Sequence, residues 1–221
     1  MERTMNDVEF EDITESEEDQ RWARIIAFGR KCSNLVPHMK QIYNWDCGLT
    51  CAAMLLRRKL PNIGHKDLTE RLESSSVWSI DLAYVLQSFG LDVSYWTTTT
   101  GIHPDYVALD FYNRVLDDDR ERVERKFREA RRHGVRVHNQ SMRAQVLEAQ
   151  IEENKMLAIV LVNCHVLRCL ECDRTDSSRQ ESSSSVPCKQ FSGHYVVICG
   201  YDPQTEVFVI KDPSSNRCKV D

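Results

Sequence analysis

A cysteine at the expected start of a helix is the residue in this chain best suited to nucleophilic chemistry. Cys47 directly precedes the segment from Gly48 to Arg58, whose apolar residues recur at helical spacing. The unpaired N–H groups and the dipole at a helix N-terminus favour a thiolate. Gln41, six residues upstream, could return its amide beside the Cys47 N–H and complete a pair of oxyanion donors. The same pattern also fits a buried cysteine at a helix start with an exposed glutamine.

A histidine that opens an apolar strand could supply the base for such a cysteine. His194 begins a run that reaches Tyr201, and a second strand from Glu206 to Lys211 follows after a short turn. A hairpin centred just after Pro203 would place Asp212 diagonal to His194. A turn shifted by half a residue would place the two directly opposite, about 5 Å apart between Cβ atoms. The alternative is a core histidine that bonds a backbone carbonyl.

These residues occur in the order of a Cys–His–Asp site. Cys47 would be the nucleophile, His194 the base and then the acid, Asp212 the group that orients the imidazole, and Gln41 an oxyanion donor. This mechanism needs no cofactor and no metal. Its substrate would be a peptide or a protein.

The motifs around these residues resemble those of a known peptidase group. The stretch from Gln41 to Cys51 resembles the active-site stretch of the papain-like, double-glycine cysteine peptidases. Gly193-His194-Tyr195 and Asp212-Pro213 resemble the His and Asp boxes of the same clan. The resemblance implies a papain-like fold around a Cys–His–Asp site.

A closer resemblance is to the guanylyl-cyclase-domain family, which comprises plant soluble guanylyl cyclase-like proteins and their animal counterparts. It is carried by Trp45–Leu49, Val77–Tyr84 and Gly193–Tyr201, and it extends from about Pro37 to Asp212. Members of that family continue past the Asp-Pro box with a helix and a last strand. The resemblance therefore implies that this chain is a truncated or alternative form.

The name of this family implies a second function, the conversion of GTP to cyclic GMP with Mg²⁺ or Mn²⁺. A nucleotide cyclase of the class III type needs two metal-binding carboxylates. The acidic residues available are Asp110, Asp117, Asp118 and Asp119, and the run from Asp117 also fits the solvated start of a helix. The chain has no glycine-rich phosphate cradle. A third alternative is a catalytically silent module that clamps a peptide or a partner.

The elements that must position these residues indicate an α+β architecture, papain-like, with N-terminal helices packed on a mainly antiparallel sheet. The residue at the start of the third expected helix, Ser79, fits an N-cap, and Gly90 fits the position after its end. The apolar run from Leu157 to Val162 predicts a central strand. The other expected helices are 66–72, 117–133 and 141–152, the last capped by Ser141, and the other expected strands are 91–96 and 135–137.

Composition and charge indicate one soluble domain behind an acidic tail. The 221 residues are 41% hydrophobic, and no apolar run approaches the roughly 18 residues that a membrane span needs. The net charge of the chain is −5, and residues 1–20 alone carry −8. The remaining residues therefore carry only +3, which is not the strong basic excess of a nucleic-acid-binding protein. We expect residues 1–34 to be a disordered acidic tail and residues 35–221 to be the folded domain. The sequence does not define the oligomeric state.

Nine cysteines without an export signal indicate reduced thiols in the cytoplasm, with the nucleus as a second location. His165, Cys169, Cys172 and Cys188 offer four nitrogen and sulfur ligands, the number that a structural zinc requires. Their spacing matches no standard zinc finger. The alternative, a flexible loop with spare thiols, is the simpler interpretation.

Overall fold

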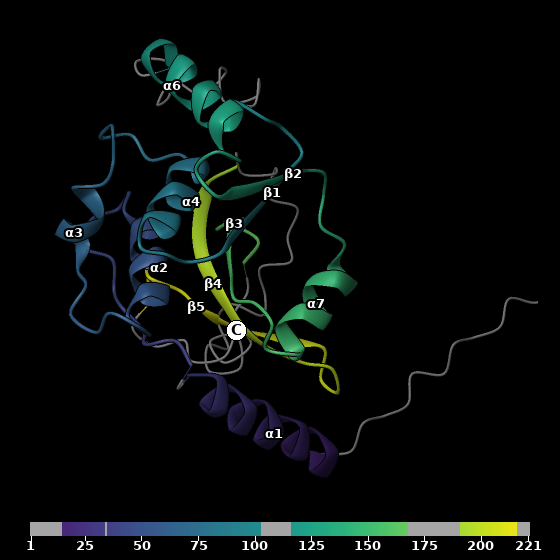
Figure 1. Ribbon diagram of the computed structural model, residues 1–221. Helices are drawn as coiled ribbons and strands as arrows, with labels where there is room; N and C mark the ends of the chain where they lie inside the picture. Colours follow the sequence, from purple (N-terminus) through teal and green to yellow (C-terminus); the bar gives the residue numbers. More distant parts are fainter. Residues whose placement is uncertain (1–14, 34, 103–115, 168–190, 216–221) are drawn as a thin grey trace, which may run out of the picture.

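A long curved strand, β4 (Gly193–Asp202), runs through the centre of the molecule and carries helices on both faces (Figure 1). The computed structural model describes residues 15–33, 35–102, 116–167 and 191–215. In this part of the chain helices and strands mix in an α+β arrangement, as expected. Helix α2 (Cys47–Leu56) packs on one face of β4, and α7 (Ala144–Glu152) packs on the other.

The larger sheet is antiparallel and has the strand order β3-β4-β5. Strand β3 (Ala158–Asn163) pairs with the first half of β4, and β5 (Val207–Lys211) pairs with the second half. The expectation of a central strand over Leu157–Val162 is wrong, because β3 is an edge strand among the described residues. Ile159 packs against the cluster that includes residues of α2, and Val160 packs against the cluster that includes Ile151 of α7, whereas Leu161 is 40% exposed.

A second, smaller sheet is parallel. Strand β1 (Val93–Thr97) pairs with β2 (Val135–Asn139) in a register that sets Val93 opposite Val135. Helix α6 (Leu116–Glu129) lies between the two strands along the chain, and a parallel pair requires such a crossover. The expectation of a mainly antiparallel sheet holds for β3, β4 and β5, and the parallel pair β1-β2 forms a separate small sheet.

The helices of the first half form a layer in which α2 contacts both α3 (His65–Thr69) and α4 (Ser79–Ser88). The predicted end of α4 is confirmed, because Gly90 follows it with φ +78°. Its N-cap is Trp78 rather than Ser79, since the Trp78 N–H donates to Asp81 Oδ2 at 2.8 Å. Helix α7 likewise begins after Arg143 rather than Ser141.

The expectation of a disordered tail over residues 1–34 is wrong for its second half. Helix α1 (Glu15–Ser33) packs against β4 and β5, so the folded unit begins before residue 35. Ile25, Phe28 and Cys32 face inward at helical spacing, and this apolar stripe stabilises the helix despite its charged surroundings. Arg24 anchors it through two hydrogen bonds to the Asp202 carboxylate, at 2.9 and 3.0 Å. Residues 1–14 lie outside the described part.

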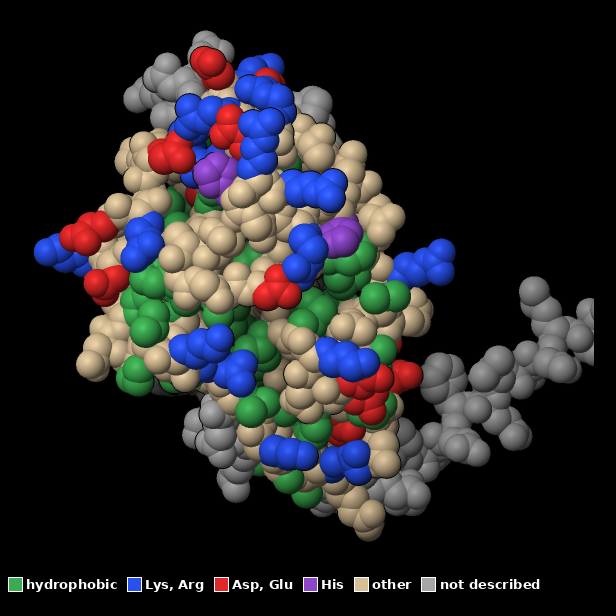
Figure 2. Space-filling view, viewed as in Figure 1, with side chains coloured by type: hydrophobic (Ala, Val, Ile, Leu, Met, Phe, Trp, Pro, Cys, Tyr) green, Lys and Arg blue, Asp and Glu red, His purple; other side chains and the backbone are tan. Residues whose placement is uncertain are grey.

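The outer face of α6 is covered by charges of both signs. Figure 2 shows Lys, Arg, Asp and Glu side chains interspersed over the end of the molecule where Figure 1 places α6. Val123 on its inner face, and Ala130 directly after the helix, are buried against α4 and β2. This distribution is that of an amphipathic helix. Within the described ranges no helix combines the length and the apolar character needed to cross a membrane.

Candidate active site

The N-terminus of α2 places Cys47 at the wall of a large cavity. Cys47 is the first residue of the helix, and its side chain is largely buried, with 8% of the residue exposed. Glycine at the next position allows a close fit, because a Cβ at Gly48 would lie 2.8 Å from Leu82 Cδ1 and 3.1 Å from the ring of Tyr195, so these side chains would have to shift. The absence of that side chain lets the start of α2 pack tightly against β4 and α4.

A fully buried carboxylate organises the loop that leads into the cysteine. Asp46 accepts hydrogen bonds from the backbone N–H groups of Ile42 and Tyr43, at 3.2 and 3.1 Å. The Nε2 atom of His65 lies 3.3 Å from the same carboxylate. The carbonyl of Asp46 accepts the N–H of Thr50 and so begins the helical hydrogen bonding. These contacts fix the position of the residue before Cys47.

His194 lies near the start of β4, opposite Val162 of β3. Its Nε2 atom lies 2.7 Å from Asp212 Oδ1, and the ring also shares a hydrogen bond with Cys47. Because Asp212 occupies Nε2, Nδ1 is the nitrogen left to face the thiol. The hydrogen bond to Asp212, followed by that to Cys47, raises the pKa of His194 to about 10, although burial opposes the shift. The ring is therefore positively charged near neutral pH.

Three hydrogen bonds, one involving His194 and two from Ser214, meet at the Oδ1 atom of Asp212. Burial raises its pKa, but hydrogen bonds from His194 and Ser214 outweigh this effect and hold the pKa of Asp212 below its ordinary value. Both the N–H and the hydroxyl of Ser214 donate to Oδ1, each at 2.7 Å. The carboxylate is thus ionised and immobile where it meets the imidazole.

Two further contacts tie the nucleophile loop to the segment that carries Asp212. The N–H of Gln41 donates to the carbonyl of Pro213 at 2.9 Å. The Nε2 atom of His38 lies 2.9 Å from the carbonyl oxygen of Asp212. Segments far apart in the sequence are therefore joined beside Asp212.

The side chain of Gln41 lies in the same loop, and its Nε2 donates to the carbonyl of Tyr43 at 2.7 Å. Its Oε1 atom is buried and has no hydrogen-bond partner among the described residues. This contact uses one of the two Nε2 hydrogens and leaves the second for another acceptor. The oxyanion role of Gln41 stays a prediction.

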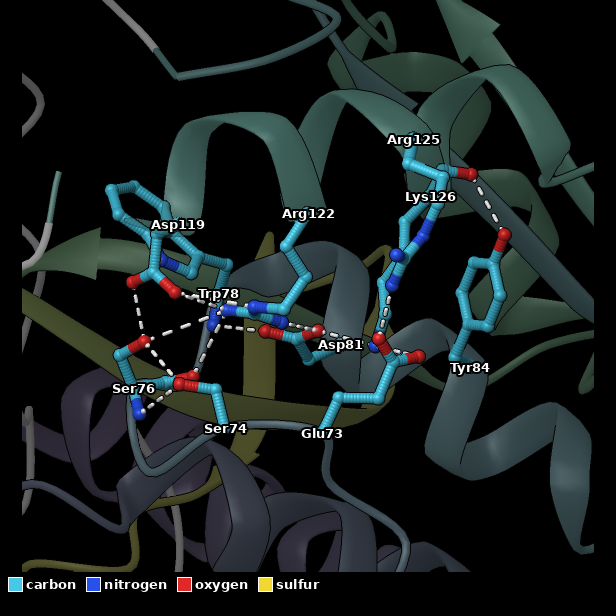
Figure 3. Close-up of polar contacts among 10 residues, drawn as sticks. All are labelled: Glu73, Ser74, Ser76, Trp78, Asp81, Tyr84, Asp119, Arg122, Arg125 and Lys126. Atoms are coloured by element: carbon cyan, nitrogen blue, oxygen red, sulfur yellow. Dashed lines mark hydrogen bonds and ion pairs between the residues drawn. The ribbon is translucent and has the colours of Figure 1, made fainter. Parts of the chain in front are cut away.

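The acidic residues expected for a metal-dependent cyclase do not gather into a metal site in the described residues. Asp119 belongs to a buried ion-pair network (Figure 3), in which it accepts hydrogen bonds from Arg122 and Trp78, each at 2.8 Å. Arg122 also donates to Asp81 at 2.6 Å. The side chains of Asp117 and Asp118, and the whole of Asp110, lie outside the described part. No group of three or more His, Cys, Asp or Glu side chains within it is placed to hold a metal ion.

The zinc prediction falls mostly on residues that are not described. His165 is exposed in the turn after β3. Cys169, Cys172 and Cys188 lie outside the described residues, so the proposed ligand set stays a prediction.

Sequence reasoning missed the part that Asp46 and Ser214 play beside the site. Asp46 precedes the cysteine and is three and four residues from the N–H groups that it accepts, a spacing typical of a local carboxylate turn. Ser214 lies two residues after Asp212, which is also turn spacing. Both signals were readable, but neither shows from sequence alone that the turn is buried.

The fold and the site together define a mixed helix-and-sheet protein in which Cys47 lies at a cavity wall and His194 and Asp212 are paired beside it. A family model described as guanylylate cyclase matches residues 36–221. The chain therefore belongs to the guanylylate cyclase family.

The chain is also similar to a curated plant protein, Guanylyl cyclase 1 of Arabidopsis thaliana. The two are 37% identical over 183 residues, which is 82% of this chain and 65% of the relative. This chain thus spans about two thirds of the length of that protein. No solved structure matches the chain.

Proposed function

We propose that this chain is a thiol-dependent acyl-transfer enzyme of the hydrolase or peptidase type, with a papain-like arrangement of its site. The observation that carries the proposal is the contact of His194 with both Asp212, at 2.7 Å, and Cys47. A cysteine at a helix start and a histidine on a facing hairpin support the papain-like arrangement. The proposed mechanism uses His194 beside the Cys47 sulfur as the group that moves the proton during catalysis.

In this mechanism the Cys47 thiolate attacks the carbonyl carbon of a peptide or another acyl substrate. The carbonyl oxygen becomes an oxyanion, which the Cys47 N–H and the second Nε2 hydrogen of Gln41 would stabilise. His194 then gives its proton to the leaving group, which departs as the neutral amine or alcohol. A water molecule loses a proton to His194 and hydrolyses the acyl-enzyme, which regenerates the thiolate. Asp212 holds the ring throughout.

The reactivity of Cys47 tests this proposal, with Cys164 as an internal reference because its thiol is free and exposed. Iodoacetamide labelling of each cysteine would be followed against pH by mass spectrometry, in wild type and in His194→Ala. We expect Cys47 to react faster than Cys164 at neutral pH despite its burial, and to lose that advantage in the variant. Labelling of Cys47 that is slower than that of Cys164 and indifferent to His194 would overturn the proposal.

Family membership favours a second candidate, the formation of cyclic GMP from GTP. It is supported by the family description and by the name of the Arabidopsis relative. Such a reaction would use GTP with Mg²⁺ or Mn²⁺. Of the described acidic residues, Asp81 and Asp119 lie close together, but both pair with Arg122 in the buried network and so do not offer a free pair of carboxylates to a metal ion.

A turnover assay separates the two candidates. Purified chain would be incubated with GTP and either metal, with ATP as the substrate control, and cyclic nucleotide would be measured. Cyclic GMP production that survives both Cys47→Ala and His194→Ala would establish the cyclase and remove the thiol site from catalysis. Absence of cyclic GMP together with fast Cys47 labelling would establish the thiol candidate.

A further inference from the structure

We propose that the substrate of the Cys47 site carries bulky apolar side chains on both sides of the bond that is attacked. The inference rests on the proposed thiol function and names the substrate class. It is carried by two clusters of exposed apolar side chains, one attached to the nucleophile segment and one to the segment that begins with His194.

The first cluster precedes the nucleophile. Trp45, two residues before Cys47, is 47% exposed and stacks on Tyr43, which is 52% exposed. Their ring centroids are 5.6 Å apart and their planes differ by 4°. His65 meets both rings edge-on, at 5.8 and 5.9 Å, and Asp46 bonds the backbone of Tyr43 from below. The two large rings are therefore held rigidly with an apolar surface in solvent.

The second cluster precedes the base. Phe191 is 45% exposed and Leu161, on the neighbouring strand β3, is 40% exposed. Both pack around Gly193, where a Cβ would lie 3.3 Å from the Phe191 ring and 3.2 Å from Leu161 Cδ1. Gly193 directly precedes His194, and its lack of a side chain lets Phe191 and Leu161 pack closely over the start of β4. An apolar surface therefore adjoins the histidine.

The two clusters belong to the same cavity. Trp45, Leu161, Phe191 and Gly193 all line the cavity that contains Cys47. The other lining residues of these two segments, Asn44 and Tyr195, are uncharged, whereas charged lining residues such as Arg58, Asp92 and Lys155 belong to other segments of this extended cavity. Exposed large apolar side chains gathered around a reactive pair mark a binding surface, because leaving such side chains in water is unfavourable and a ligand can cover them. A charged or strongly polar substrate would lose its hydration against these walls without a compensating hydrogen bond.

The test compares two alkylating reagents that share one reaction but differ in size and polarity. The rates of Cys47 alkylation by iodoacetamide and by N-benzyl iodoacetamide would be measured, and their ratio would be divided by the ratio for N-acetylcysteine. This normalised ratio removes the intrinsic reactivity of the sulfur. We expect it to favour the benzyl reagent by about tenfold in wild type, which corresponds to the binding of one aromatic ring. It should fall toward unity in Trp45→Ala and in Phe191→Ala.

Leu60→Ala is the control, because Leu60 is an exposed apolar residue that does not line the cavity. It should keep the wild-type ratio. The two variants on separate segments guard against a local folding defect in either one. A fast-reacting Cys47 with a normalised ratio near unity would overturn this inference and leave the thiol function standing. Slow reaction with both reagents, relative to Cys164, would overturn the thiol function and this inference with it.

Discussion

His194 and Asp212 meet across a hairpin in which they are not register partners. The last ordered pair of the hairpin is Val197 with Lys211, so continued pairing would set Asp212 opposite Val196, two residues from the histidine. The carboxylate nevertheless lies 2.7 Å from Nε2 of His194. The contact is diagonal, and it forms because Ser214 turns the chain and holds the carboxylate toward the ring.

The first prediction concerns the titration of His194. Its pKa of about 10 is raised first by the hydrogen bond to Asp212. Asp212→Asn replaces the carboxylate with a neutral amide, and we expect the pKa of His194 to fall toward its ordinary value. NMR titration of the imidazole measures the shift. Asp92→Asn, at an exposed ion pair with Arg136, should leave His194 unchanged. A wild-type His194 that titrates near 6.5 would contradict the geometry.

The second prediction concerns stability against pH. Because the pKa of His194 is raised in the folded state, its protonation stabilises the fold fully below about 6.5, and this contribution is lost as pH rises through about 10. The free energy of unfolding should therefore fall across this range, and His194→Gln should flatten the fall. Urea unfolding at several pH values measures both slopes. His133→Gln, at an exposed histidine paired with Glu129, should retain the wild-type slope.

The third prediction concerns the buried ion-pair network (Figure 3). Arg122→Met removes the cation between Asp81 and Asp119, and it leaves the buried Asp119 carboxylate without an opposite charge. We expect a loss of about 3–5 kcal/mol in the free energy of unfolding. Arg128→Met, on the exposed face of the same helix, should cost less than about 0.5 kcal/mol. Equal effects of the two substitutions in urea unfolding would show that the network adds nothing.

The fourth prediction concerns the contact between α1 and β4. A Cβ at Gly200 would overlap Cys32 Sγ and lie 3.3 Å from Phe28 Cε1. Gly200→Ala should therefore destabilise the fold by about 1–3 kcal/mol. Cys32→Ala removes the overlapping sulfur, so the double variant should be more stable than the sum of the two single effects predicts. If the two changes in the free energy of unfolding simply add, in thermal or urea unfolding, Cys32 of α1 does not contact Gly200 as described.

The elements with strong local signals were predictable from the sequence. The helix at Cys47 follows from the apolar spacing of its residues, and the glycine after α4 follows from the need for positive φ. From the sequence, only a short helix over Trp22–Phe28 is expected, and the full length of α1 was missed because the acidic residues around it obscured the stripe of Ile25, Phe28 and Cys32. That stripe becomes significant only once β4 and β5 exist to cover it.

The site divides in the same way. The order of Cys47, His194 and Asp212 was readable, and their contacts follow it. The register of the hairpin could not be predicted from the sequence. Strands β4 and β5 are irregular between Ile198 and Gly200, and such a bulge changes which residues pair on its far side. The pairing of Asp81 with Arg122 also escaped, since it joins residues 41 positions apart on two helices.

The tie between His38 and the Asp212 carbonyl has a consequence for the synthesis of the protein. The two residues are 174 positions apart, and His194 lies far along the chain from Cys47. A contact of such long sequence separation forms late, after a large loop has closed. While the chain emerges from the ribosome, the helix of Cys47 can fold without any imidazole beside it. The sulfur therefore acquires His194 as a neighbour only when the C-terminal hairpin docks.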